Sequence, residues 1–192
     1  MKQLHIKWAG RCFGPAIKSI KSAMVLLLCA AAPLGAQAGT GSRAPGLPTN
    51  CASIQVPEGN KVCFHVYAVG VQIYRWDGSA WAFVAPAAVL YANAEQDGEV
   101  GTHYAGPTWE SNSGSKVVGR RIAGCAPDAT AIPWLLLQTV TAEGPGIFHC
   151  VTYVQRVNTA GGLAPAAPGT VTGAVQQVPY TAEYFFYRAA KE

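Results

Sequence analysis

The segment GTHYAGPTWESNSGS, residues 101–115, contains side chains that could do acid–base chemistry. His103 lies before the Gly106-Pro107 turn and Glu110 lies after it. If the flanks of the turn pair as strands, the imidazole approaches the carboxylate, and a histidine oriented by a carboxylate can act as a general base. A hairpin that only pairs opposite charges has the same pattern. Both interpretations stay open, and no nucleophile or oxyanion hole is evident nearby.

The rest of the sequence lacks the specific signatures of catalysis. It contains no HExxH helix, no GxSxG elbow and no P-loop. His65 and His149 lie in apolar stretches, where a histidine is more typical of a half-buried, hydrogen-bonded side chain than of a ligand. The pairs His65 with Cys63 and His149 with Cys150 suggest a metal site, but neither has the CxxC spacing of a zinc knuckle. We therefore predict no metal and no cofactor.

Aromatic residues near predicted turns suggest a binding function instead. Rings at the ends of strands can form a platform for sugars or other flat ligands, although they can equally fill a core, as we expect for Trp134. The candidate binding residues are Tyr74, Trp76, Tyr104, Trp109 and Arg156, and Trp81 is a further aromatic residue near a turn. Both site hypotheses require that His103, Glu110, Trp109, Tyr74 and Arg156 converge on one cavity.

The elements that position these side chains are predicted to be short strands. VCFHVYAVGVQIYRW, from residue 62, is rich in β-branched and aromatic residues. Asp77-Gly78, Asp97-Gly98 and Gly144-Pro145-Gly146 are turn signals between such stretches. No segment has a sustained helical stripe. The pattern predicts an all-β fold, a single antiparallel β-sandwich or barrel-like domain with about nine or ten strands.

Two strands and one loop carry more detailed predictions. Trp134 to Leu137 is continuously apolar and is predicted to be buried on both faces. In YTAEYFFYR, from residue 180, alternation places Tyr180, Tyr184 and Phe186 on one side and Glu183 and Tyr187 on the other. Residues 159–179 form a long Gly/Pro/Ala-rich connection, which is either a lid or binding loop or a surface crossover.

The N-terminus has the three parts of a secretory signal. A basic run precedes the apolar stretch from Ala23, and Ala36-Gln37-Ala38 places small residues where a signal peptidase cleaves. An uncleaved anchor is the alternative, and a lipoprotein anchor at Cys29 is disfavoured because Leu28 is not small. We predict a signal peptide at 1–38, a Gly/Pro-rich linker at 39–56 and one domain at 57–192. The protein is then secreted or periplasmic, with no stable membrane span after cleavage.

Cleavage also changes the charge of the chain. The formal net charge is +4, but five of the fourteen basic residues and none of the ten acidic ones precede residue 39. The remaining nine basic and ten acidic residues give a net charge near −1. Arg120-Arg121 is an isolated pair, so no basic stripe is left to neutralise phosphates. We therefore expect no nucleic-acid binding.

Four cysteines follow the predicted signal, an even number in a chain bound for an oxidising compartment. Four cysteines allow three pairings. We favour Cys51–Cys63 and Cys125–Cys150, because each bridge joins neighbours along the chain.

Several blocks are similar to a known family. They are GVQIYRW (70–76), GTHYAGPTWE (101–110), IPWLLL (132–137), VTYVQRVNTAGG (151–162) and VPYTAEYFFY (178–187). The chain resembles, over nearly all of the part from Pro57, a family of secreted bacterial and fungal proteins of unknown function. Many relatives have cysteines where this chain has Trp76 and in the loop around Gly169, so the resemblance implies no bridge pattern for this chain.

Some fungal members of that family carry the label malate dehydrogenase, which the residues contradict. A dinucleotide site needs a Gly-rich turn between a strand and a helix, and the nearest match, GTGSRAPG at 39–46, is misspaced and precedes any predicted strand. We predict instead a non-catalytic β domain whose partner is a small ligand, a glycan or an envelope component. The alternatives are a secreted hydrolase-like enzyme using His103 and Glu110, and a structural cell-surface protein without a pocket.

Overall fold

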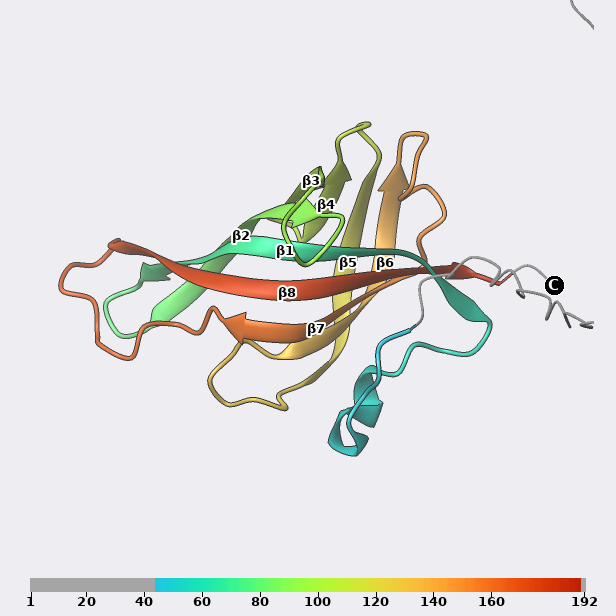
Figure 1. The fold of residues 1–192 in the computed structure, drawn as a ribbon. Coiled ribbons are helices and arrows are strands. Elements are labelled where there is room, and N and C mark those ends of the chain that lie inside the picture. Colours follow the sequence, from blue (N-terminus) through green and yellow to red (C-terminus); the bar gives the residue numbers. More distant parts are fainter. Residues whose placement is uncertain (1–43, 191–192) are drawn as a thin grey trace, which may run out of the picture. The chain divides into compact units, whose positions relative to one another are not determined.

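The computed structural model describes residues 44–190, and these form a closed antiparallel barrel. Its elements are the 3-10 helix η1 (Thr49–Ile54) and the strands β1 (Asn60–Trp76), β2 (Trp81–Tyr91), β3 (Glu99–Tyr104), β4 (Thr108–Ser111), β5 (Lys116–Cys125), β6 (Trp134–Glu143), β7 (Tyr153–Gly161) and β8 (Val175–Ala189). Each strand pairs with the next, and β8 pairs with β1 (Figure 1). The all-β prediction is confirmed, and the barrel-like alternative within it is the one observed.

The longest strands close the barrel. β1 and β8 pair from Asn60 opposite Ala189 to Arg75 opposite Val175. Two glycines let neighbouring strands approach closely: a Cβ at Gly70 would overlap the carbonyl oxygen of Ala87, and one at Gly101 would overlap that of Glu110. At both positions the close approach of two backbones, and not a turn, requires glycine.

We expect the substitution Gly70→Ala to lower the free energy of unfolding by about 1–3 kcal/mol, because the added methyl group forces β1 and β2 apart. Gly46→Ala is the matched control, since a Cβ there meets no atom within 4 Å. Urea denaturation of both variants measures the difference. Equal stability of the two would contradict the close packing at Gly70.

Alternation along the strands separates two apolar clusters. The barrel interior contains Val66, Ala68, Trp109, Leu137, Val154, Tyr180, Tyr184 and Phe186, among others. Leu136, Phe185 and Tyr187 belong to a second cluster on the outer face. The predicted division of β8 between two faces is therefore confirmed. So is the burial of the 134–137 stretch on both faces, because Leu136 and Leu137 enter different clusters.

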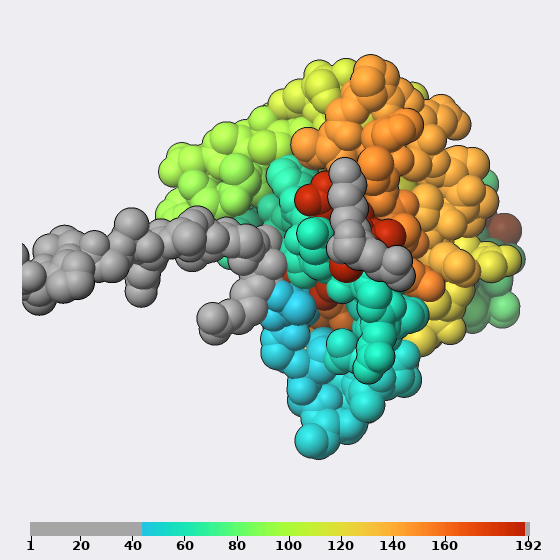
Figure 2. Space-filling view, turned by 90° about the vertical axis from the view of Figure 1, so that its right-hand side faces the viewer, coloured from blue at the N-terminus to red at the C-terminus, as the bar shows by residue number. Residues whose placement is uncertain are grey.

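One end of the barrel is filled by aromatic side chains. Phe148, in the β6–β7 connection, packs against Phe64 and Phe186 with ring centroids 6.0 and 4.8 Å away. The orange atoms of this connection gather on the face that Figure 2 shows. The connections β1–β2, β3–β4, β5–β6 and β7–β8 lie at the other end, because successive antiparallel strands run in opposite directions.

The segment before β1 packs against the outer face of the barrel. Cys51, Ile54 and Val56 are buried with the outward-facing residues of β6, β7 and β8. The Gln155 side-chain amide donates a hydrogen bond to the carbonyl oxygen of Ile54 at 2.8 Å. Part of the predicted linker at 39–56 therefore packs against the outer face of the sheet. The sequence did not indicate this packing, because the segment has no hydrophobic periodicity.

The disulfide in the structure joins Cys51 to Cys125, 74 residues apart, with a Cα–Cα distance of 5.3 Å. The favoured pairs Cys51–Cys63 and Cys125–Cys150 are therefore wrong. Sequence proximity misled the prediction because η1 lies beside β5, whereas Cys63 is on β1. Cys63 and Cys150 are exposed free thiols in the described part of the chain.

The predicted signal peptide and the start of the predicted linker lie outside the described residues. Between residues 44 and 190, no helix has the length and apolar character needed to cross a membrane.

Candidate functional site

A cavity of about 440 Å³ lies at the end of the barrel opposite Phe148. Its lining is mostly apolar, and its volume is within the range of roughly 300–1,000 Å³ typical of ligand sites. It is lined by Gln72, Tyr74, Phe83, Val84, Pro86, His103, Gly106, Pro107, Trp109, Arg121, Ile132, Pro133, Leu135, Leu137, Arg156 and Tyr184. Phe83 and Val84 are 55% and 47% exposed, which places them at a solvent-facing rim. A barrel of eight strands has room inside for one small ligand.

His103 is a buried ionisable group of the site, with 3% of its surface exposed. Its Nδ1 lies 2.8 Å from the carbonyl oxygen of Thr108. Because a carbonyl only accepts, Nδ1 carries the proton and Nε2 is left as an acceptor. The ring stacks on Trp109, with centroids 4.4 Å apart and planes 9° from parallel, and meets Tyr184 edge-on.

The imidazole of His103 is held neutral. Burial lowers its pKa to about 3, the Thr108 hydrogen bond opposes that shift, and the positive charge of Arg156 adds to it. A buried histidine resists protonation because its charged form loses hydration. His103 therefore acts near neutral pH as a neutral donor and acceptor.

Glu110 lies on the outside of the barrel. In the β3–β4 ladder His103 is opposite Trp109, and Thr102 is opposite Glu110. Because successive side chains alternate between faces, this register points His103 and Trp109 inward and Glu110 outward. The structure therefore does not bring His103 and Glu110 together, and the hypothesised acid–base pair does not form.

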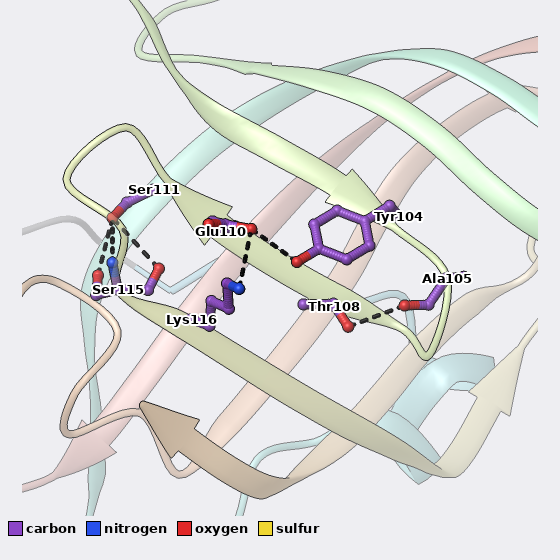
Figure 3. Close-up of polar contacts among 7 residues, drawn as sticks. All are labelled: Tyr104, Ala105, Thr108, Glu110, Ser111, Ser115 and Lys116. Atoms are coloured by element: carbon purple, nitrogen blue, oxygen red, sulfur yellow. Dashed lines mark hydrogen bonds and ion pairs between the residues drawn. The ribbon is translucent and has the colours of Figure 1, made fainter. Parts of the chain in front are cut away.

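The partners of Glu110 are two surface side chains (Figure 3). The Tyr104 hydroxyl donates to its Oε2 at 2.7 Å, and Lys116 Nζ is 3.5 Å from the same oxygen. The hydrogen bond to Glu110 raises the pKa of Tyr104. This arrangement is a surface contact across three adjacent strands, and it does not reach the cavity.

The other candidate residues divide between the cavity and the outside. Tyr74, Trp109 and Arg156 line the cavity with His103. Trp76 does not: it packs edge-on against Trp81, with centroids 5.4 Å apart. A Cβ at Gly169 would press on the Trp76 ring, so the two regions in which the resemblance places cysteines are in contact here.

The long loop between β7 and β8 is attached to the end of β1 and β2 (Figure 1). The Tyr74 hydroxyl donates to the carbonyl oxygen of Gly162 at 2.7 Å, and Trp81 Nε1 donates to that of Ala167 at 2.9 Å. The backbone N–H of Gly173 bonds to the carbonyl oxygen of Trp76 at 2.8 Å. These bonds anchor both ends of the loop beside the mouth of the cavity.

Sequence reasoning missed several polar residues of the interior. Gln72 is buried at the cavity wall, and Tyr180 and Tyr184 lie on the inner face of β8, on either side of Ala182. The sequence did contain one signal for Gln72. It lies two residues before the candidate Tyr74, and residues at this spacing in a strand point to the same face. A single glutamine in an apolar strand does not indicate a site by itself, and only the closed barrel shows that Gln72 lines the cavity.

No group of three or more His, Cys, Asp or Glu side chains in residues 44–190 is arranged to hold a metal ion.

Comparisons with known proteins give one match. No curated protein and no solved structure matches the chain significantly. The family described as "Protein of unknown function (DUF3455)" matches residues 57–188, which is more than half of the chain and includes every strand of the barrel except the last residue of β8. The chain therefore belongs to the DUF3455 family of proteins of unknown function.

Proposed function

We propose that this protein is a non-catalytic binding barrel that holds one small, largely apolar ligand in the cavity at its open end. The observation that carries the proposal is the cavity itself, which opens at an apolar rim and has buried polar groups in its wall. A concave, mostly apolar pocket with a few convergent polar groups is the usual form of a small-molecule site.

Unpaired polar atoms support a ligand over a simple packing defect. Trp109 Nε1, Gln72 Nε2 and the Tyr184 hydroxyl are buried and have no hydrogen-bond partner among the described residues. All three residues line the cavity. Buried polar atoms are nearly always hydrogen-bonded, and each one left unpaired costs about 1–3 kcal/mol. These atoms have almost no accessible surface, so a bound molecule with polar groups would supply the missing partners after small rotations of the three side chains.

The composition of the wall supports binding over hydrolysis. In the described chain, the cavity lining includes no carboxylate, serine or cysteine. His103 has its Nδ1 committed to Thr108, and Glu110 lies on the other side of the wall. The residues named for hydrolase-like chemistry thus have no shared space in which to act on a substrate.

We place this function outside the cytoplasm. The Cys51–Cys125 disulfide supports an oxidising compartment, where such bonds persist. The three-part N-terminal sequence supports export. A free small molecule, a glycan or a lipid-like component of the cell envelope is then a suitable partner, and the apolar wall favours one with a hydrocarbon part.

Filling the cavity tests the proposal. Leu135 lines the cavity on β6, and we expect Leu135→Trp to weaken binding of the neutral dye Nile red at least tenfold, measured by fluorescence titration. Val140→Trp is the matched control, because Val140 is exposed on the same strand. Thermal unfolding verifies that both variants are folded. Unchanged dye binding in a folded Leu135→Trp protein would exclude this cavity as the site.

A further inference from the structure

We infer that the ligand is an organic monoanion whose carboxylate binds Arg156 inside the barrel. This inference rests on the proposed function, since it assigns the chemical class of the ligand of the same cavity. It is carried by a buried cation that no acidic side chain between residues 44 and 190 balances, beside buried polar atoms that make no hydrogen bond there.

Arg156 is 9% exposed, on the inner face of β7. Its Nε and Nη2 donate to the carbonyl oxygen of Pro133 at 3.2 and 2.7 Å. The ion pairs within residues 44–190 are His65–Glu183 and Lys116–Glu110, and neither includes Arg156. A charge removed from water is costly unless it is paired. Arg156 thus carries an unbalanced positive charge at the cavity wall.

Buried groups around Arg156 are able to donate hydrogen bonds. The Tyr180 and Tyr184 hydroxyls and Gln72 Nε2 are buried and lie near one another, and none of the three makes a well-directed hydrogen bond among the described residues. Arg156 lies close enough to Tyr74 and Tyr180 to affect their ionisation. Burial raises the pKa of both hydroxyls, and the positive charge of Arg156 lowers it in part. A guanidinium beside unpartnered donors is suited to an anionic acceptor, since charge-assisted hydrogen bonds are shorter and stronger than neutral ones.

The net charge of the site favours a single negative charge. Arg156 is the one buried cation of the lining, because His103 is neutral and Arg121 is exposed. A carboxylate balances Arg156, whereas a dianionic phosphate would leave a charge unpaired in an apolar cavity. The planar carboxylate also matches the fork of a guanidinium. Arg121, where the wall is open to solvent, adds a positive potential that attracts anions to the cavity.

The ligand's remaining part must suit an apolar wall. Phe83 and Val84 lie at the rim and Leu135 lines the wall, and no acidic side chain occurs among the described lining residues. The structure therefore favours a molecule with a hydrocarbon body that follows its carboxylate into the barrel.

The test uses three ligands of equal chain length that differ only in the head group: decanoate, decanol and decylammonium. Isothermal titration calorimetry on the intact protein measures their dissociation constants near pH 7. We expect decanoate to bind roughly ten- to a hundred-fold more tightly than decanol, as expected for hydrogen bonds to a charged group. Decylammonium should bind more weakly than decanol, because its charge repels Arg156.

Arg156→Met removes the charge and keeps an unbranched apolar side chain. We expect the variant to lose the preference for decanoate while it retains binding of decanol. Arg120→Met is the matched control: Arg120 is exposed on β5 and does not line the cavity, so the preference should stay. If Arg156→Met does not fold, the three ligands with the unsubstituted protein still decide the question.

The possible failures separate the two proposals. Equal binding of decanoate and decanol overturns the carboxylate inference and leaves the binding barrel intact. No binding of any of the three, together with no binding of Nile red, overturns the proposed function itself. If inorganic phosphate or chloride displaces decanoate at equal concentration, the site binds small anions and the hydrocarbon body is not recognised, which also overturns the inference.

Discussion

Loss of the Cys51–Cys125 disulfide is expected to lower the free energy of unfolding by about 3–4 kcal/mol. The bond closes a loop of 74 residues, and cross-links over long loops restrict the unfolded chain most. The same bond holds η1 against the outer face of the barrel, where Cys51 and Ile54 are fully buried. Its loss therefore also releases the cover over the outward side chains of β6, β7 and β8.

The double substitution Cys51→Ser with Cys125→Ser measures this effect by urea denaturation at constant pH. The matched control is Cys63→Ser with Cys150→Ser, which removes two exposed thiols and should change stability by less than about 1 kcal/mol. Equal losses in the two double variants would show that the 51–125 bond is not the stabilising one.

Acidification is expected to destabilise the barrel through His103. The pKa of its imidazole is lowered to about 3 in the folded protein, from 6.5 in the unfolded chain. Between these values only the unfolded chain binds the proton, so the stability that His103 contributes is complete above pH 6.5 and is lost as the pH falls toward 3. The loss amounts to about 3–5 kcal/mol over this range, at 1.36 kcal/mol for each pH unit.

His103→Asn isolates this contribution. The asparagine amide can still donate to Thr108, while the titrating group and the stacking on Trp109 are removed. We expect lower stability at pH 7 and a much flatter decline between pH 6.5 and 3, with a residual slope from His65, whose pKa burial also lowers. His149→Asn, at an exposed position, should leave the decline unchanged. An equally steep decline in His103→Asn and the unsubstituted protein would contradict the burial of a neutral His103.

The all-β class and the faces of individual strands follow from the sequence because they depend on local periodicity. Alternation in β8 separated Tyr184 and Phe186 from Tyr187, and the structure places these residues in the interior and outer clusters. The continuous apolar run at 134–137 also predicted a strand with two buried faces. Aromatic content and the spacing of turns identified Tyr74 and Trp109 as candidates for the cavity that they line.

Long-range pairing decided what the sequence could not. The partner of Cys51 is 74 residues away, so chain proximity predicted the wrong bridge. Closure of β1 with β8 decides which buried polar side chains share the interior, and it brings Gln72, Tyr184 and Arg156 to one cavity from three strands. In the sequence, Arg156 is a basic residue with no other charged residue beside it. Only the assembled strands show that no carboxylate of the described residues pairs with it.

The register of β3 and β4 had the largest consequence for function. His103 lies opposite Trp109, which turns Glu110 to the other face. A shift of one residue in a ladder exchanges the two faces of a strand. The composition of residues 101–115 was therefore compatible both with an acid–base pair and with a buried histidine inside a barrel. Only the hydrogen-bonded pairing of the strands, fixed by packing on both faces of the wall, decided between them.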